Sequence, residues 1–216
     1  LLNNSGDLMM IQGNLDGAIE RLGQARQLKT EIYGEDNVST ARTLLLLAQA
    51  HMASGDLSPV PELLEKAGGS YLATYGADSR KMSFYELVAG QYRLATGDIA
   101  GAREILRAAY EHRLEEYDAD NIVVLSPLFT LISLELRAGN AAQARQWLEE
   151  TRPAVEPLKM THPEFIEAGI LEAEVLVAEG QRDPARSAAS EMLNLLNEHL
   201  PGRQDWINRC VAILER

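Results

Sequence analysis

The residue types that most often do chemistry are few in this sequence and lie far apart. It contains one cysteine, Cys210, and four histidines, His51, His112, His162 and His199. No two histidines have the short helical spacing that presents a pair of zinc ligands, and a single cysteine can neither complete a cysteine zinc site nor form an internal disulfide. We therefore predict no metal site and no cofactor.

Sequence motifs for nucleotide binding and for nucleophilic catalysis are also absent. The chain has no glycine-rich phosphate-binding loop and no nucleophile elbow of the hydrolase type. The acidic pairs Glu115-Glu116 and Glu149-Glu150 fall where helix ends and linkers are expected, and carboxylates in such places are usually solvated. The sequence thus predicts a protein that is not an enzyme.

The composition is that of an acidic, folded protein. Hydrophobic residues make up 46% of the chain, which argues against a disordered segment. The formal charge of −12, from 32 acidic and 20 basic side chains, repels phosphate backbones, so we predict no nucleic-acid partner. No apolar run approaches the roughly 20 residues that span a bilayer, and one cysteine fits a reducing compartment. We therefore predict no membrane contact and a cytoplasmic protein.

Short turns built on glycine recur along the chain with a nearly constant spacing. Gly13, Gly55, Gly97, Gly139 and Gly180 stand in such turns, at intervals of 42, 42, 42 and 41 residues. A helix end commonly needs one residue with positive φ, which glycine adopts most easily. Between the turns the apolar residues recur with the 3.6-residue period of a helix. Each glycine is therefore predicted to separate two helices.

A second series of turns keeps the same period, half a repeat out of phase. It reads Tyr33-Gly34-Glu35-Asp36-Asn37, Tyr75-Gly76-Ala77-Asp78-Ser79 and Tyr117-Asp118-Ala119-Asp120-Asn121. The Asp and Asn residues of these linkers are expected to cap the next helix by accepting its free backbone N–H groups. Each repeat is thus a helix, a tight glycine turn, a second helix and a looser linker.

One helical pair cannot bury its apolar face alone, but stacked neighbours share a continuous core. We therefore predict an all-α fold, an α-solenoid of about five helix-turn-helix repeats that is closed by a C-terminal capping helix. The repeats form a single domain over residues 1–216, with boundaries near 1–36, 37–78, 79–120, 121–161 and 162–200 and the capping helix at 204–215.

The second repeat resembles the tetratricopeptide repeat pattern. The likeness is carried by Leu47-Ala48, Gly55-Asp56-Leu57, Leu63-Leu64 and Ala67. The 42-residue period and the linker at 33–37 resemble the longer variety seen in kinesin light chains and in many bacterial signalling proteins. The resemblance covers about residues 8–200. The chain departs from the pattern at Gly90, which stands where Ala48 stands one repeat earlier, and at Gly68-Gly69 inside a predicted helix.

This resemblance implies a right-handed superhelix in which the first helix of each repeat lines a groove that holds a peptide or a partner's helix. Carried onto this sequence, the groove positions fall 13, 10 and 6 residues before each turn glycine. The three columns are Arg42, Phe84, Ser126 and Glu167; Leu45, Leu87, Phe129 and Ile170; and Gln49, Gln91, Ser133 and Glu174. Buried polar side chains need partners, so the polar third column is better placed on a wet groove; the alternative is that it is only the solvated edge of each helix.

Three functional hypotheses follow. The first is a protein–protein interaction module with a scaffolding or regulatory role, which binds a peptide or partner protein in the groove. The second is a peptide- or ligand-sensing regulatory domain of a bacterial transcription regulator or protein kinase. For that hypothesis the start at Leu1-Leu2 rather than Met, typical of a piece of a longer protein, leaves room for an upstream effector domain. The third is self-association into a homo-oligomer through the end repeats.

Overall fold

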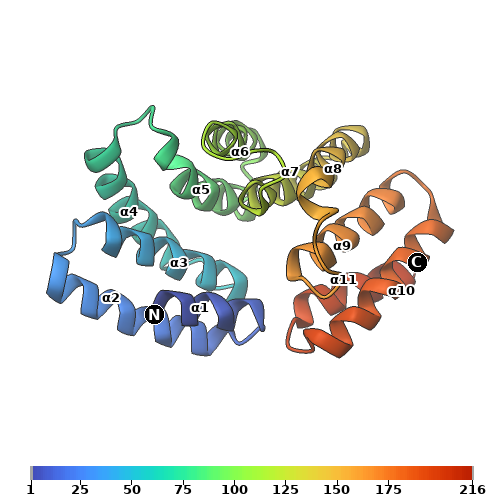
Figure 1. Ribbon diagram of the computed structural model, residues 1–216, viewed down its shortest axis with the longest axis horizontal. Coiled ribbons are helices and arrows are strands. Elements are labelled where there is room, and N and C mark those ends of the chain that lie inside the picture. The colour runs from blue at the N-terminus through green and yellow to red at the C-terminus, as the bar shows by residue number, and fades with distance from the viewer. Residues whose placement is uncertain (1, 216) are drawn as a thin grey trace. The chain divides into compact units, whose positions relative to one another are not determined.

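The computed structural model describes residues 2–215 and consists of helices and their connections. Leu1 and Arg216, the two ends of the predicted domain, lie outside the described residues. Within residues 2–215 there are eleven α-helices, two short 3₁₀-helices and no strand (Figure 1). The predicted all-α solenoid of helical repeats is confirmed.

The helices form two compact units, residues 1–112 and 113–216. The first unit contains α1 (Leu2–Ile11), α2 (Leu15–Tyr33), α3 (Val38–Ser54), α4 (Val60–Tyr75), the 3₁₀-helix η1 (Arg80–Met82), α5 (Ser83–Ala95) and most of α6 (Ile99–Leu114). The second contains η2 (Ile122–Val124), α7 (Leu125–Arg137), α8 (Ala141–Val155), α9 (Pro163–Ala178), α10 (Arg182–His199) and α11 (Gln204–Leu214). The prediction of a single domain and its repeat boundaries stays a prediction.

Within each unit the first helices of successive repeats lie side by side. In the first unit α1 contacts α3 and α3 contacts α5, while in the second α7 contacts α9 and α9 contacts α11. Helix α11 therefore takes the place that the first helix of another repeat would occupy. We call the surface formed by α1, α3 and α5, or by α7, α9 and α11, the A-helix face of the respective unit.

The glycine turns have the conformation that their spacing predicts. Gly13, Gly55, Gly97, Gly139 and Gly180 all have positive φ, between 76° and 88°. The residue after each glycine donates its backbone N–H to a carbonyl five residues earlier, as from Asp56 to His51 at 3.1 Å and from Asp98 to Arg93 at 2.9 Å. This bond satisfies a carbonyl that the helix end leaves without a partner.

The linkers supply the helix caps. The side-chain oxygen of Asn37 accepts from the backbone N–H of Ser39 at 2.8 Å, and that of Asn121 accepts from Val123 at 3.0 Å. Ser79 does the same at the start of η1. The predicted capping role is confirmed for Asn37 and Asn121, whereas in the second linker the cap is Ser79 and not Asp78.

The two helices of a repeat approach closely where the first carries glycine. A Cβ atom on Gly6 would lie 2.6 Å from Cγ of Leu22, and one on Gly90 would lie 2.5 Å from Cγ of Leu106. Both leucines are fully buried, and both follow their glycine by 16 residues. Glycine at 90 is therefore a packing feature, which lets a buried leucine rest against the helix backbone.

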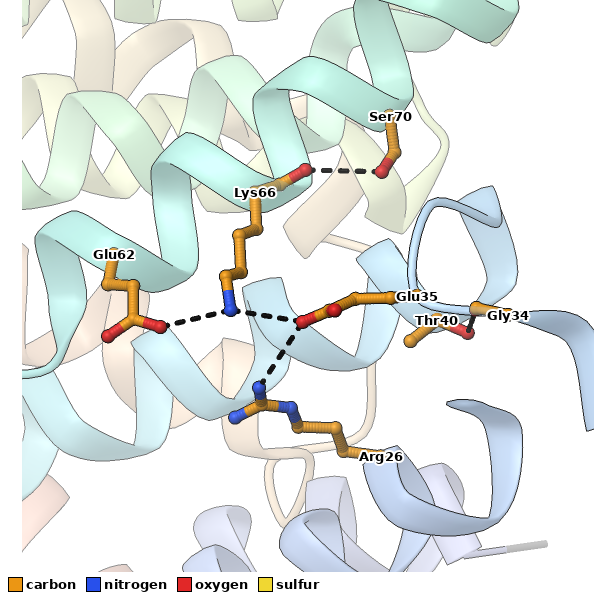
Figure 2. Close-up of polar contacts among 7 residues, drawn as sticks. All are labelled: Arg26, Gly34, Glu35, Thr40, Glu62, Lys66 and Ser70. Carbon is orange, nitrogen blue, oxygen red and sulfur yellow. Dashed lines mark hydrogen bonds and ion pairs between the residues drawn. The ribbon is translucent and has the colours of Figure 1, made fainter. Parts of the chain in front are cut away.

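The linker after α2 is tied to two repeats (Figure 2). Glu35 accepts a hydrogen bond from Nζ of Lys66 on α4 at 3.0 Å and lies 3.8 Å from Nη2 of Arg26 on α2. The hydroxyl of the buried Thr40 donates to the carbonyl of Gly34 at 2.9 Å. The glutamate is half exposed, so solvent screens these ion pairs. They connect the linker to α2 of the first repeat and to α4 of the second.

In the second unit an arginine fork joins α8 to the end of α9. Arg145 bonds Glu179 through Nε at 2.9 Å and Nη2 at 2.7 Å. This hydrogen bonding holds the pKa of the Glu179 carboxyl below its ordinary value of 4.5. A carboxyl with a lowered pKa stabilises the folded state at pH values above its unfolded pKa, and the contribution disappears as the pH falls through the folded pKa.

Glu179→Gln is therefore expected to cost about 1 kcal/mol of unfolding free energy at pH 7 and close to nothing at pH 3. Chemical denaturation followed by circular dichroism at the two pH values measures the difference. The exposed Glu191 on α10 is the control, and Glu191→Gln should change little at either pH. A Glu179→Gln cost that is the same at pH 3 and pH 7 would contradict the assigned role.

Candidate functional site

The second predicted groove column lies in the core. Leu45 and Ile170 are 0% exposed, Leu87 is 2% exposed and Phe129 is 4% exposed. These four side chains have no surface to offer a partner, so we remove them from the predicted contact surface. The reason is geometric: the first helices pack against neighbours on several sides, and a position 10 residues before the turn points between helices.

The first column is accessible, and two of its members touch. The Arg42 guanidinium lies 4.8 Å from the ring centroid of Phe84, which is within reach of a cation–π interaction. Phe84 follows Arg42 by one repeat of 42 residues. In the second unit Ser126 is exposed and Glu167 is half-buried. Burial raises the pKa of the Glu167 carboxyl, and the nearby arginines Arg209 and Arg203 oppose the shift.

The third column of the first unit forms a direct side-chain contact between repeats. Nε2 of Gln49 on α3 donates to Oε1 of Gln91 on α5 at 3.0 Å. Both glutamines are half-buried. Equivalent residues 42 positions apart therefore meet on the A-helix face of the first unit, as Arg42 and Phe84 also do.

One member of this row was missed by the sequence reasoning. Asp7 on α1 stands six residues before Gly13, the same position as Gln49 and Gln91, and it is half-buried. Burial raises the pKa of its carboxyl, and the charge of Arg42 only partly offsets the effect. The signal that locates it is the same glycine spacing, applied to the first repeat.

In the second unit the third column meets the capping helix. Arg209 on α11 donates through Nε and Nη2 to the two carboxylate oxygens of Glu174, each at 2.8 Å. Burial alone would lower the pKa of Arg209, but the Glu174 carboxylate keeps it above its ordinary value. Arg209 was also missed, because the glycine spacing does not extend to α11.

These residues line a cleft of about 500 Å³ on the A-helix face of the second unit. Ser133, Glu174 and Arg209 are its polar members, together with the exposed Arg137. Its apolar lining consists of Leu136, Val177, Ala178, Ala212 and Ile213. A mixed lining of this kind and size is typical of a site that holds a small ligand or part of a peptide.

Two of the histidines each lie beside a single carboxylate. His112 on α6 lies 2.9 Å from Oε2 of Glu86 on α5, and His51 lies 3.6 Å from Oδ2 of Asp56. The part of the chain that the structure describes holds no cluster of three or more His, Cys, Asp or Glu side chains suited to a metal ion. Among residues 2–215, no helix is both long and apolar enough to cross a membrane.

Comparison with known proteins agrees with the repeat geometry. Residues 1–67 match the family model of the tetratricopeptide repeat. Two similar solved structures are crystal structures of nearly identical TPR-like repeats from a Podosopora anserina protein assigned as a kinesin light chain. One, a single-substitution variant, has a TM-score of 0.63 at 19% identity and covers 91% of this chain and 93% of its own. The other has a TM-score of 0.61 at 18% identity and covers 91% and 94%. No curated protein matches the sequence.

Proposed function

We propose that this chain, which carries tetratricopeptide repeats of the kinesin-light-chain-like variety, is an interaction module that binds a peptide segment of a partner protein on the A-helix face of its first unit. Tetratricopeptide repeats are in general protein–protein interaction modules. The observation that carries the proposal is the contact of equivalent polar residues in successive repeats, Gln49 with Gln91. On that face the contact surface consists of Asp7, Arg42, Gln49, Phe84 and Gln91. The accessible columns of the second unit, Ser126, Glu167, Ser133 and Glu174, form a separate contact surface on the A-helix face of that unit.

The chemistry of a glutamine row suits a peptide backbone. A glutamine side chain has two N–H donors and a carbonyl oxygen that accepts, and the bond to Gln91 uses one N–H of Gln49. An extended peptide presents N–H and C=O groups along its whole length. A row of amides in helical register can therefore hydrogen-bond a backbone of almost any sequence, while Arg42 and Phe84 beside it contact side chains.

The test is a selection of random dodecapeptides displayed on phage, with the full chain as bait. The dissociation constant of a selected peptide is then measured by fluorescence anisotropy. Gln49→Ala combined with Gln91→Ala should weaken binding about thirtyfold, because the two lost hydrogen bonds are worth about 1 kcal/mol each.

The matched control is Gln24→Ala combined with Gln27→Ala, since both of these glutamines are exposed on α2. The control variant should bind the selected peptide with an affinity within about twofold of the wild-type value. Circular dichroism checks that both double variants are folded. Enrichment of no peptide, or equal affinity of the wild type and the Gln49/Gln91 variant, would sink the proposal.

A further inference from the structure

The cleft between α7, α9 and α11 has a lining that restricts what can enter it. Its apolar side chains come from all three helices: Leu136 from α7, Val177 and Ala178 from α9, and Ala212 and Ile213 from α11. Its volume of about 500 Å³ is larger than one side chain requires and smaller than a docked helix. The cleft therefore fits one large side chain together with the backbone that carries it.

The charges inside the cleft are already matched. Arg209 donates two parallel hydrogen bonds to Glu174, which use both oxygens of the carboxylate. Their side chains are only 28% and 25% exposed. Arg137, the other charged lining residue, also has an interaction partner. A charged side chain entering the cleft would lose water without gaining a counterion, unless it broke the fork apart.

We propose that this cleft is an anchor pocket for one large uncharged side chain, aliphatic or aromatic, of a peptide bound on the A-helix face of the second unit, and that the closed Arg209–Glu174 pair excludes charged side chains from it. The inference rests on the proposed function, because it names the residue class that the contact surface of this unit accepts. Specificity here comes from a penalty on the wrong ligand as much as from contacts with the right one. Removing the carboxylate should therefore let an anionic side chain bind, and removing the guanidinium should let a cationic side chain bind.

The probes are the N-acetyl amides of leucine, tryptophan, lysine and glutamate, titrated into the full ¹⁵N-labelled chain and followed by NMR. The leucine and tryptophan amides should shift the backbone signals of Val177, Ala178 and Ala212. The lysine and glutamate amides should bind at least about fivefold more weakly.

Two near-isosteric variants test the role of the ion pair. Glu174→Gln removes the carboxylate that accepts both hydrogen bonds of Arg209, so the glutamate amide should gain at least about fivefold in affinity. Arg209→Met exposes Glu174, so the lysine amide should gain instead. The control is the Arg145–Glu179 fork of the same unit: Arg145→Met and Glu179→Gln remove a pair of the same geometry outside the cleft and should leave all four affinities unchanged.

The inference is overturned if the charged probes bind the wild type as tightly as the leucine amide. It is also overturned if the apolar probes shift signals outside the cleft, or if the two cleft variants do not change preference in opposite senses. The spectrum of each variant shows whether it is folded. Peptide binding that responds to Gln49 and Gln91 but not to Glu174 or Arg209 would leave the interaction module standing and remove only the anchor pocket.

Discussion

Phe129→Ala is expected to lower the unfolding free energy by about 3–5 kcal/mol, the cost of deleting a buried aromatic ring and leaving a cavity. Phe129 is 4% exposed and lies in α7 among other buried side chains of the second unit. The loss is a large fraction of the stability of a typical domain. Urea unfolding followed by circular dichroism at 222 nm measures it.

The matched control for Phe129 is Ser126, one turn earlier on the same helix. Ser126 is exposed, so Ser126→Ala should change stability by no more than about 0.5 kcal/mol. Comparing the two variants distinguishes a surface position from a core position at residue 129. If Phe129 lay on the surface, Phe129→Ala would change stability as little as Ser126→Ala does. A loss below about 1 kcal/mol for Phe129→Ala would contradict its assignment to the core.

Gly90→Ala is expected to destabilise the first unit by about 1–3 kcal/mol, the usual cost of overpacking a filled core. The new methyl group would lie 2.5 Å from Cγ of Leu106 and 3.1 Å from Cγ2 of Ile105. Leu106 is fully buried, so it cannot move aside without disturbing its own neighbours. The clash is expected to outweigh the gain that alanine normally brings to a helix. Thermal unfolding of the wild type and the variant measures the effect.

Gly69→Ala is expected to raise the stability of the protein, whereas Gly90→Ala lowers it. Gly69 lies inside α4, is exposed, and a Cβ atom there would meet no other atom within 4 Å. Alanine should therefore stabilise the helix by about 0.5–1 kcal/mol, because it lowers the entropy of the unfolded chain. If both variants stabilise the protein, the close approach of α5 and α6 at Gly90 is not as tight as the structure has it.

The features that the sequence predicted well are local or periodic. The glycines of the tight turns and the Asn caps act within a few residues of their own position, so residue type and spacing were enough to predict both. The all-α solenoid followed from two series of turns with one period. The repeats of Gly13 and Gly55 also fall in the part of the chain that matches the tetratricopeptide family model.

The sequence was less informative about which face of each helix is free. Leu45, Leu87, Phe129 and Ile170 occupy a regular column, and regularity alone does not distinguish a binding surface from a core that repeats. An apolar residue at the same place in every repeat is expected both for a binding surface and for a core. Only the packing of each first helix against its neighbours decides between them.

The amino-acid sequence by itself determined the helices, their order and the glycine and linker turns between them, because these depend on φ preferences, caps and apolar periodicity along the chain. The tertiary structure decided which columns reach the surface, why Gly90 must lack a side chain, and that Arg209 on the capping helix pairs with Glu174, 35 residues earlier. These outcomes depend on distances between separate helices, and such distances are set by the packing of many side chains at once rather than by any repeating pattern in the chain.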